Sequence, residues 1–572
     1  MTEQRGYGRC LVVVAVLTLA LGGLAYRLVT LHFGFDSRAR DHAEHARQFK
    51  EKLEVGRGRI QDGSPSGNIL ALSTPVKDVF VDPAFIVKSN CVNRVSRGLA
   101  GPLGLDVGLV TQKLSRADRH FEYVARFVPE EQAAAVAALK LPGVHFEDVT
   151  ARSYPHGTFL CHVLGFANLE GLGGAGIEAG MDRFLRGAAG LREGSMDGRR
   201  QEEPALRVQD IPAQEGCNVV LTIDQNVQYI VEKALDAALE RNHTERGWAI
   251  VQRVRTGEIL AMVSRPAYDP NDFRHATDAQ LLNRTIACVY EPGSTMKVTI
   301  IASALDEGIV QADTVFDCEN GHWLYGKRVL RDYHPSGQLT VADIVQRSSN
   351  IGAAKIALRM GNERVDQALR RFHIGTPLGI DLPGEEAGIL HPVREWSEVS
   401  ATRMAIGQGV SVTALQMLGA VSTIANDGLV MKPFVVKRVV RHDGTVLFEQ
   451  QSRSLGRAIQ PETAALMRRL LTRVTQEGGT GTKAAVPGYT VAGKTGTAQK
   501  PVAGHYSEND YMASFVGFLP AEQPDIAMIV VVDTPQPLHT GGQVAAPVFA
   551  EIAEQAVRYL DTAATAYALN RF

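Results

Sequence analysis

A serine and a lysine stand three residues apart in the segment EPGSTMK, residues 291–297. The Pro292-Gly293 pair breaks the chain, and the residues that follow carry a helical apolar stripe as far as Gly308. A helix beginning near Ser294 would place Lys297 beside it, because residues i and i+3 are neighbours. A serine hydroxyl needs an adjacent base to become a nucleophile, and a lysine serves only when its pKa is lowered. The spacing indicates nucleophilic chemistry, although an ordinary helix cap and a solvated lysine would give the same pattern.

Two later segments supply partners for this pair. QRSSNIGAAKIAL (346–358) contains an S-x-N motif, and VAGKTGTAQ (491–499) contains a K-T-G motif. S-x-x-K, S-x-N and K-T-G in this chain order are a signature shared by class A β-lactamases and penicillin-binding proteins. The candidate catalytic residues are Ser294, Lys297, Ser348 and Asn350, and the candidate substrate-binding residues are Lys494, Thr495, Gly496 and Thr497.

The elements around these motifs indicate an α+β fold. Helical patterns at 341–346 and 351–360 flank the S-x-N motif, which predicts a turn that aims Ser348 and Asn350 into a cleft. Lys494 lies on a short extended segment before two apolar strands, 512–520 and 526–534. Further strands are expected at 218–224, 247–254 and 258–264, and further helices at 227–242 and 545–569. An antiparallel sheet with a helical part accounts for this order.

The N-terminus carries a long apolar run. Residues 10–26 have no charge, and after Arg27 the apolar character continues to residue 35. The run can span a bilayer if Arg27 reaches the interface. A signal peptide cleaved after a Gly-Leu-Ala sequence is the alternative, but the length favours an uncleaved anchor. We therefore expect a cytoplasmic tail at 1–9, a transmembrane anchor at 10–31 and the rest of the chain outside the cytoplasm.

The remaining sequence divides into two domains, 32–215 and 216–572. The first is mixed: we expect a helix at 128–144, short strands at 77–83 and 160–168, and an exposed connection at 195–216. A net charge of −2 argues against nucleic-acid binding. Six cysteines show neither paired nor metal-like spacing, which favours free thiols and leaves a disulfide open. We expect no metal and no cofactor.

Several segments resemble one family over nearly the whole chain. VGRGRIQD (55–62), RSYPHG (152–157), VVLTIDQNVQ (219–228) and MAIGQGVSVTALQ (404–416) look like those of class B penicillin-binding proteins, which are peptidoglycan D,D-transpeptidases. Within that family the chain most resembles the division-specific FtsI group. One departure is GSPSG (63–67), where the family often has Arg-Asn-Gly. It lies outside the three motifs.

The resemblance implies a mechanism with named roles. Ser294 would attack the carbonyl between the last two D-alanines of a stem peptide, with Lys297 as base, helped to stay neutral by repulsion from Lys494. Ser348 would relay the proton, and Asn350 would bind the substrate amide or hold Lys297. The K-T-G residues would bind the terminal carboxylate. The backbone N–H groups of Ser294 and Thr497 would form the oxyanion hole.

The resemblance also implies partners and a place in the cell. The expected partners are peptidoglycan stem peptides, β-lactams bound covalently at Ser294, a membrane glycan polymerase of the SEDS type and other divisome proteins. The expected location is the bacterial cytoplasmic (inner) membrane at the septum, with residues 32–215 as a pedestal or dimerisation-type domain and 216–572 as the transpeptidase domain.

Other functions share parts of this pattern. An elongation-type class B enzyme has the same chemistry. A β-lactamase or carboxypeptidase shares the three motifs, but 351–493 lacks the E-x-x-L-N string of class A lactamases. A catalytically silent scaffold is disfavoured by the intact motifs, and a bifunctional enzyme by the missing E-D-x-x-F-x-x-H string. We expect Asp332 and His334 to be structural, Ser349 to cap or pack, and Gly407-Gln408-Gly409 to be a turn.

Overall fold

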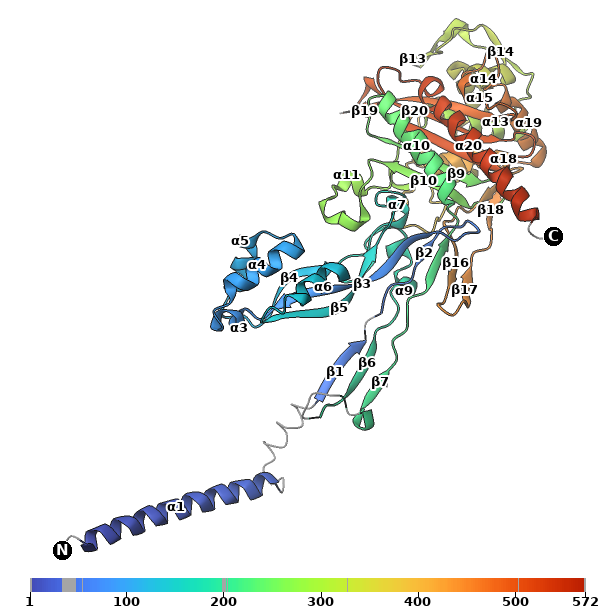
Figure 1. Ribbon diagram of the computed structural model, residues 1–572. Coiled ribbons are helices and arrows are strands. Elements are labelled where there is room, and N and C mark those ends of the chain that lie inside the picture. Colours follow the sequence, from blue (N-terminus) through green and yellow to red (C-terminus); the bar gives the residue numbers. More distant parts are fainter. Residues whose placement is uncertain are drawn as a thin grey trace. The chain divides into compact units, whose positions relative to one another are not determined.

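The structure is a computed structural model that describes residues 3–32, 48–53, 55–197, 202, 204–326, 328–502 and 504–569 (Figure 1). The chain divides into two compact units. One comprises Met1–Val55 and Gly187–Glu215, and the other comprises Gly56–Arg186 and Gly216–Phe572. Each unit is described by itself.

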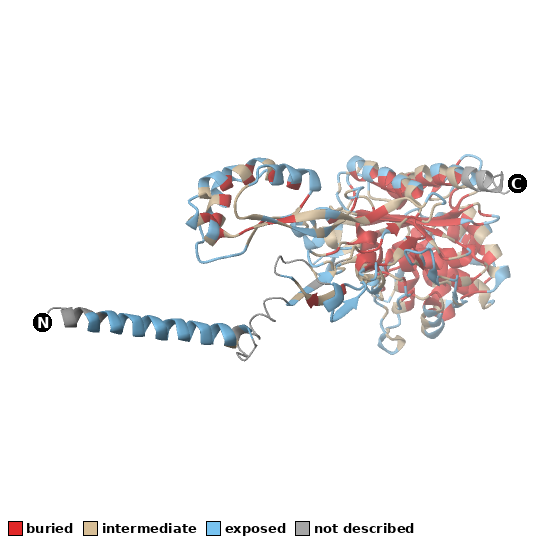
Figure 2. Cartoon of the chain, turned by 60° about the horizontal axis from the view of Figure 1, so that its bottom comes forward, coloured by how far each residue is buried: buried red, intermediate tan, exposed pale blue. Residues whose placement is uncertain are grey.

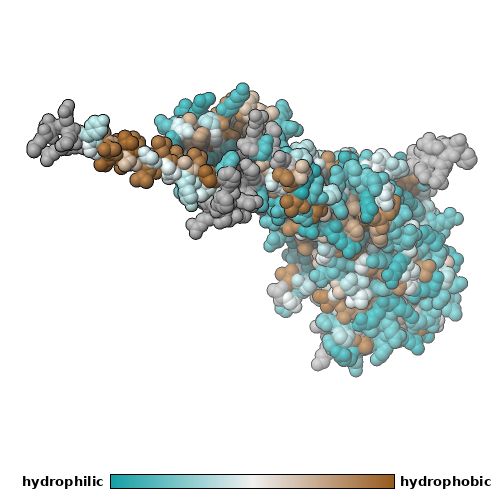
Figure 3. Space-filling model, turned by 90° about the horizontal axis from the view of Figure 1, so that it is seen from below, coloured by the Kyte–Doolittle hydropathy of each residue, from teal (hydrophilic) through white to brown (hydrophobic). Residues whose placement is uncertain are grey.

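The first unit contains a long apolar helix and a small sheet. Helix α1 (Glu3–His32) includes the stretch Cys10–Thr30, which is long and apolar enough to cross a membrane, and its hydrophobic side chains are exposed (Figure 3). The sheet is antiparallel, in the order β1-β6-β7, with β1 at Gln48–Leu53, β6 at Gly190–Ser195 and β7 at Gln209–Ile211. The predicted connection at 195–216 therefore contains a strand, although β7 is exposed as expected. Residues 198–201 and 203 of that segment lie outside the described residues.

The second unit is built on a five-stranded antiparallel sheet in the order β10-β9-β21-β20-β19. Its strands are β9 (Gly247–Arg253), β10 (Ile259–Arg265), β19 (Ala492–Val502), β20 (His505–Leu519) and β21 (Ile526–Asp533). Strands buried on both faces read as continuous apolar runs rather than alternating ones, and β21 is buried along its whole length. The buried residues, red in Figure 2, gather in the body of this unit.

Helices cover both faces of this sheet. On one face α10 (Gln225–Arg241) and α20 (Gly541–Leu569) share a core cluster with the strands. A larger core cluster on the other face holds the helical part. Its helices are α13 (Lys297–Asp306), α14 (Val341–Arg347), α15 (Asn350–Met360), α16 (Asn362–Arg371), α17 (Ser400–Ala405), α18 (Ala414–Ala425) and α19 (Pro461–Thr472). The predicted α+β fold is confirmed.

A second sheet of the same unit runs in the order β17-β16-β8-β2-β3-β4, and β5 also pairs with β3. It contains β2 (Ile60–Gln61), β8 (Asn218–Leu221), β16 (Val436–Val440) and β17 (Val446–Glu449). The strands β3 (Ile69–Val81), β4 (Glu122–Val128) and β5 (Val144–Ser153) pack with α3 (Pro83–Lys88), α4 (Val92–Leu103), α5 (Val107–Leu114) and α6 (Glu130–Ala138) around a separate core.

Two of the predicted elements in this region are confirmed and one is wrong. The predicted helix at 128–144 contains α6, and the predicted strand at 77–83 overlaps the end of β3, which stops at Val81. The predicted strand at 160–168 instead contains the short helix α7 (Cys161–Leu164), which follows Leu160 at a positive φ of 57°. Periodicity alone does not separate a strand from a buried helix in so short an apolar run.

Two of the family-like segments, 55–62 and 152–157, meet Glu178 and Asp182 in a buried ion cluster. The fully buried Glu178 carboxylate accepts hydrogen bonds from Arg152 Nε at 2.5 Å and from Arg57 Nε at 2.9 Å. The Tyr154 hydroxyl donates to the same carboxylate at 3.3 Å, and Arg57 also pairs with Asp182 at 2.6 Å. A buried carboxylate needs such partners, so Arg57, Arg152 and Tyr154 compensate for the burial of the Glu178 charge.

Candidate active site

The nucleophile candidate lies on a tight turn in front of α13. Residues Gly293–Met296 form a 3₁₀ turn, and the α-helix begins at Lys297 instead of near Ser294 as predicted. Side chains at i and i+3 eclipse in a 3₁₀ turn, so Lys297 Nζ still lies 3.0 Å from Ser294 Oγ. Gly293 has a φ of 57°, and a Cβ there would lie 2.9 Å from the carbonyl oxygen of Thr497. Glycine therefore lets the nucleophile turn approach strand β19 closely.

Lys297 is buried among oxygen atoms. Only 1 % of it is exposed, and its Nζ donates to the Ser348 carbonyl at 2.6 Å and to Asn350 Oδ1 at 2.7 Å. Burial lowers the pKa of Lys297 to about 7. A neutral amine has two N–H bonds for those two acceptors, and its lone pair remains for the Ser294 hydroxyl proton. The arrangement suits a base beside a nucleophile.

The S-x-N motif forms the predicted turn between α14 and α15. Ser348 adopts the left-handed conformation, with a φ of 59°, which is uncommon for residues other than glycine and is often found at functional sites. Ser349 caps α15 by accepting a hydrogen bond from Gly352 N at 2.9 Å, as predicted. Asn350 is the first residue of the helix, and its Nδ2 donates to the Arg331 carbonyl, which fixes Oδ1 toward Lys297.

The K-T-G motif lies on β19, which is the edge strand of the five-stranded sheet and pairs only with β20 among the described strands of that sheet. Lys494 is 1 % exposed, and its Nζ donates to Ser348 Oγ at 2.8 Å. Ser348 Oγ is also 3.2 Å from Lys297 Nζ, so this hydroxyl lies between the two lysines. The Ser348 hydroxyl can therefore pass a proton between the groups on its two sides, Lys297 and Lys494.

The two buried lysines repel each other when both are charged, so each disfavours the charged form of the other. Burial is the main cause that lowers the pKa of Lys297, and the Asp332 carboxylate opposes that shift. Burial and then the Lys297 charge lower the pKa of Lys494 well below its ordinary value. The expected help of Lys494 in keeping Lys297 neutral stays a prediction. A carboxylate bound beside Lys494 would favour its charged form again.

The other K-T-G residues are closely packed. A Cβ on Gly496 would lie 2.2 Å from Ser514 Oγ, so only glycine fits there. The Thr495 hydroxyl is 2.7 Å from the Thr480 hydroxyl, and the residue as a whole is 6 % exposed. Thr497 is half-buried, and its Oγ1 accepts a hydrogen bond from Gly541 N at 3.0 Å. Of the two threonines, Thr497 is the more accessible to a ligand.

The comparisons with known proteins decide the family. The penicillin-binding protein transpeptidase domain matches residues 247–554, and the penicillin-binding protein dimerisation domain matches residues 52–221. The chain belongs to the class B penicillin-binding proteins. This class B protein is 31 % identical to the probable peptidoglycan D,D-transpeptidase PenA of Neisseria meningitidis, over 96 % of this chain and 92 % of the relative.

Two further similarities agree with that family. The chain is 33 % identical to the peptidoglycan D,D-transpeptidase FtsI of Escherichia coli, over 88 % of this chain and 83 % of the relative. Its structure resembles that of penicillin-binding protein 3 of Mycobacterium tuberculosis in complex with aztreonam, with a TM-score of 0.69 and 27 % identity, covering 89 % and 97 % of the two chains. The transpeptidase domain and its three motifs mark this class B protein as a D,D-transpeptidase, an acyltransferase.

The nucleophile turn has one further support that no sequence motif predicted. Gly407-Gln408-Gly409 is a turn, as predicted, but it also packs against that turn: a Cβ on Gly407 would lie 2.1 Å from the Gly293 carbonyl oxygen. Gly409 N donates to Glu291 Oε1 at 2.7 Å, and the Tyr506 hydroxyl donates to the same oxygen at 3.2 Å. The two glycines within three residues are the sequence feature from which this close backbone approach could have been predicted.

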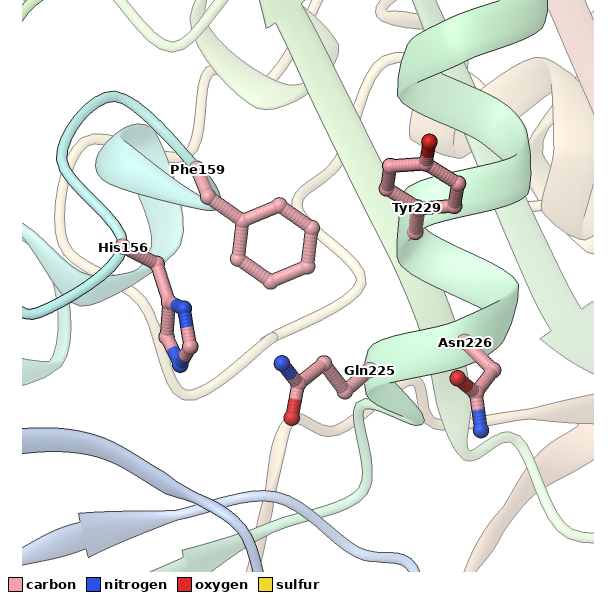
Figure 4. Close-up of a pocket in the computed structure, with 5 residues that line it drawn as sticks. All are labelled: His156, Phe159, Gln225, Asn226 and Tyr229. Carbon is pink, nitrogen blue, oxygen red and sulfur yellow. The ribbon is translucent and has the colours of Figure 1, made fainter.

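One cavity is lined by residues outside the three motifs. It has a volume of about 280 Å³ and is lined by His156, Phe159, Gln225, Asn226 and Tyr229 (Figure 4). These residues come from the loop before α7 and from the start of α10, and none of them belongs to the motifs.

Proposed function

We propose that this class B penicillin-binding protein cross-links peptidoglycan stem peptides during cell division through an acyl-enzyme on Ser294. The observation that carries the proposal is the line of polar atoms from Ser294 Oγ through Lys297 Nζ and Ser348 Oγ to Lys494 Nζ, with separations of 3.0, 3.2 and 2.8 Å. It joins a nucleophile, a base, a proton relay and a lysine whose charged form a bound carboxylate would favour in one cluster.

In the acylation step, Ser294 Oγ bonds to the carbonyl carbon of the penultimate D-alanine. Its proton moves to Lys297 Nζ, whose lone pair faces the hydroxyl in the neutral form. The C–N bond to the terminal D-alanine then breaks. Ser348 donates its hydroxyl proton to the leaving nitrogen and receives in turn the proton held by Lys297. D-Alanine therefore leaves as an amine that carries this proton, and Lys297 is neutral again.

In the second step, an amine of a neighbouring stem peptide attacks the ester on Ser294. The new amide forms, the ester C–O bond breaks, and the proton lost by the amine returns through the Lys297 and Ser348 pair to Ser294 Oγ. Lys494 and the Thr497 hydroxyl would bind the terminal carboxylate of the donor peptide, with Thr495 in support and Gly496 leaving room. The backbone N–H groups of Ser294 and Thr497 would bind the oxyanion.

We further propose that the protein is held in the bacterial cytoplasmic membrane by residues 10–31, with its catalytic domain outside the cytoplasm at the septum. The exposed apolar helix α1 supports an anchor, and the similarity to FtsI supports a septal role over an elongation role. N-terminal sequencing of the mature protein should find the anchor attached. A chain beginning just after residue 25 would show a cleaved signal peptide instead.

The proposed partners are a membrane glycan polymerase of the SEDS type and other division proteins, which would contact the anchor and the region 32–215. An aromatic cluster on that region supports a docking surface: Phe80 lies 4.8 Å from Phe121 and 5.3 Å from His145 between ring centroids, and Phe121 is 48 % exposed. Imaging of the labelled protein tests the septal role, since localisation along the side wall would favour the elongation-type alternative.

Penicillin acylation tests the chemistry. The leaving nitrogen of an opened β-lactam stays tethered to the acyl group, so the adduct should remain on the wild-type protein far longer than one turnover. Intact mass should rise by one drug molecule, mapped by digestion to the peptide containing EPGSTMK, and Ser294→Ala should show no adduct. Rapid loss of the added mass with release of hydrolysed drug would favour a β-lactamase-like hydrolase.

A further inference from the structure

Asp332 touches the S-x-N turn with both carboxylate oxygens. It follows strand β13 (Arg328–Arg331), and its backbone N–H donates to the Gly321 carbonyl. Asp332 Oδ1 accepts hydrogen bonds from Asn350 N at 2.5 Å and Ile351 N at 3.0 Å, and Oδ2 accepts one from the Ser349 hydroxyl at 2.6 Å. Three donors from consecutive residues therefore meet one half-buried carboxylate.

These contacts fix the start of α15. The first N–H groups of a helix have no partner within it, and a carboxylate there is favoured by the helix dipole. Asp332 satisfies two such N–H groups. The preceding residue, Arg331, accepts from Asn350 Nδ2 through its carbonyl at 2.8 Å. The segment after β13 thus holds both the backbone and the side chain of Asn350.

The chain of contacts continues to the nucleophile. Asn350 Oδ1 lies 2.7 Å from Lys297 Nζ, and Lys297 Nζ lies 3.0 Å from Ser294 Oγ. We propose that Asp332 is a positioning residue of the acylation reaction, which holds Asn350 against the Lys297 amine. The inference rests on the proposed role of Lys297 as the base for Ser294, and it replaces the structural loop role expected for Asp332 from the sequence.

The charge of Asp332 gives this role a measurable signature. The Asp332 carboxylate raises the pKa of Lys297 against the lowering effect of burial. A second lysine also lies close: Lys494 on β19 donates to the Ser348 hydroxyl, and Lys297 bonds to that hydroxyl too. On α15, Lys355 forms an ion pair with Glu319 at 2.6 Å. Removing the Asp332 charge should lower the pKa of Lys297. The acid limb of the pH–rate profile, where the acylation rate falls as Lys297 becomes protonated, should therefore move to lower pH.

The test compares Asp332→Asn, Asp332→Glu and Asp317→Asn in the full chain. Asp317 ends strand β11 (Val315–Asp317), and its side chain accepts a hydrogen bond from Glu319 N. Within the described part of the chain, no hydrogen bond or ion pair joins the Asp317 side chain to the S-x-N turn, so Asp317→Asn is a matched loss of charge. The readout is the acylation rate constant with a fluorescent penicillin over a range of pH, with thermal unfolding measured for each variant.

We expect Asp332→Asn to lower the plateau rate on the order of tenfold or more, since small misplacements of reacting groups are costly. Its acid limb should shift to lower pH. Asp332→Glu should keep the wild-type limb at a reduced plateau, and Asp317→Asn should match wild type. A lower melting temperature with an unshifted limb in Asp332→Asn would overturn the proposal, as would a wild-type profile. If Asp332→Asn does not fold, a shifted limb in Asp332→Glu would overturn it.

The same experiment separates this inference from the proposed function. A wild-type protein that is acylated at Ser294 while Asp332→Asn keeps the wild-type profile contradicts only the positioning role. A wild-type protein that gives no adduct at Ser294 contradicts the proposed function itself.

Discussion

Acylation of Ser294 should show an acid limb near neutral pH, because only neutral Lys297 can accept the serine proton. Burial lowers the pKa of Lys297 from its ordinary 10.5 to about 7. At pH 7 a lysine with the ordinary pKa is neutral in roughly one molecule of 3,000, whereas Lys297 is neutral in about half, a gain on the order of a thousandfold. Below that pH the protonated amine accumulates and the rate should fall about tenfold per pH unit.

The assay is the second-order rate constant for a fluorescent penicillin at constant ionic strength, from about pH 5 to about pH 10. Lys297→Arg is the informative variant, since a guanidinium keeps its proton throughout that range. It should lose the acid limb and, with its base removed, at least about a hundredfold of the rate at pH 8.

Two results would refute the reasoning. A rate that is flat across the neutral range in a folded wild-type protein would mean that Lys297 does not titrate there. An unchanged limb in Lys297→Arg would assign the titration to another group.

Three further predictions follow from the same structure. The pKa of Lys297 is lower in the folded than in the unfolded chain, so the unfolded state binds more protons between about pH 7 and about pH 10. The free energy of unfolding should therefore rise with pH in that range. Thermal unfolding of Lys297→Met should show a weaker dependence on pH. Lys494→Ala should harm acylation more than Lys494→Arg, which keeps the positive charge but changes its shape; equal damage would mean that the ammonium itself is required. Glu178→Ala should leave Arg57 and Arg152 without their buried partner and cost roughly 3–5 kcal/mol of unfolding free energy; a melting temperature like that of wild type would contradict this.

Local sequence was enough to identify the chemistry and much of the secondary structure. The i, i+3 spacing of Ser294 and Lys297 brings their side chains together in either kind of helical turn, so the late start of α13 did not matter. Apolar strands such as β21 and the amphipathic α10 were also predicted, because their patterns are long enough to reveal a period. The short run at 160–168 was too short for that, and it was predicted as a strand instead of a helix.

Tertiary structure decided what the motifs do together. Lys494 Nζ reaches Ser348 Oγ across 146 residues of sequence, and Asp332 reaches the S-x-N turn from a separate hairpin. No local pattern marks such a contact, since any polar residue of a loop could face solvent. The lowered pKa of Lys297 likewise comes from burial by residues distant in the chain. A sequence can place a lysine beside a serine, but only the packed fold removes the water that would keep that lysine charged.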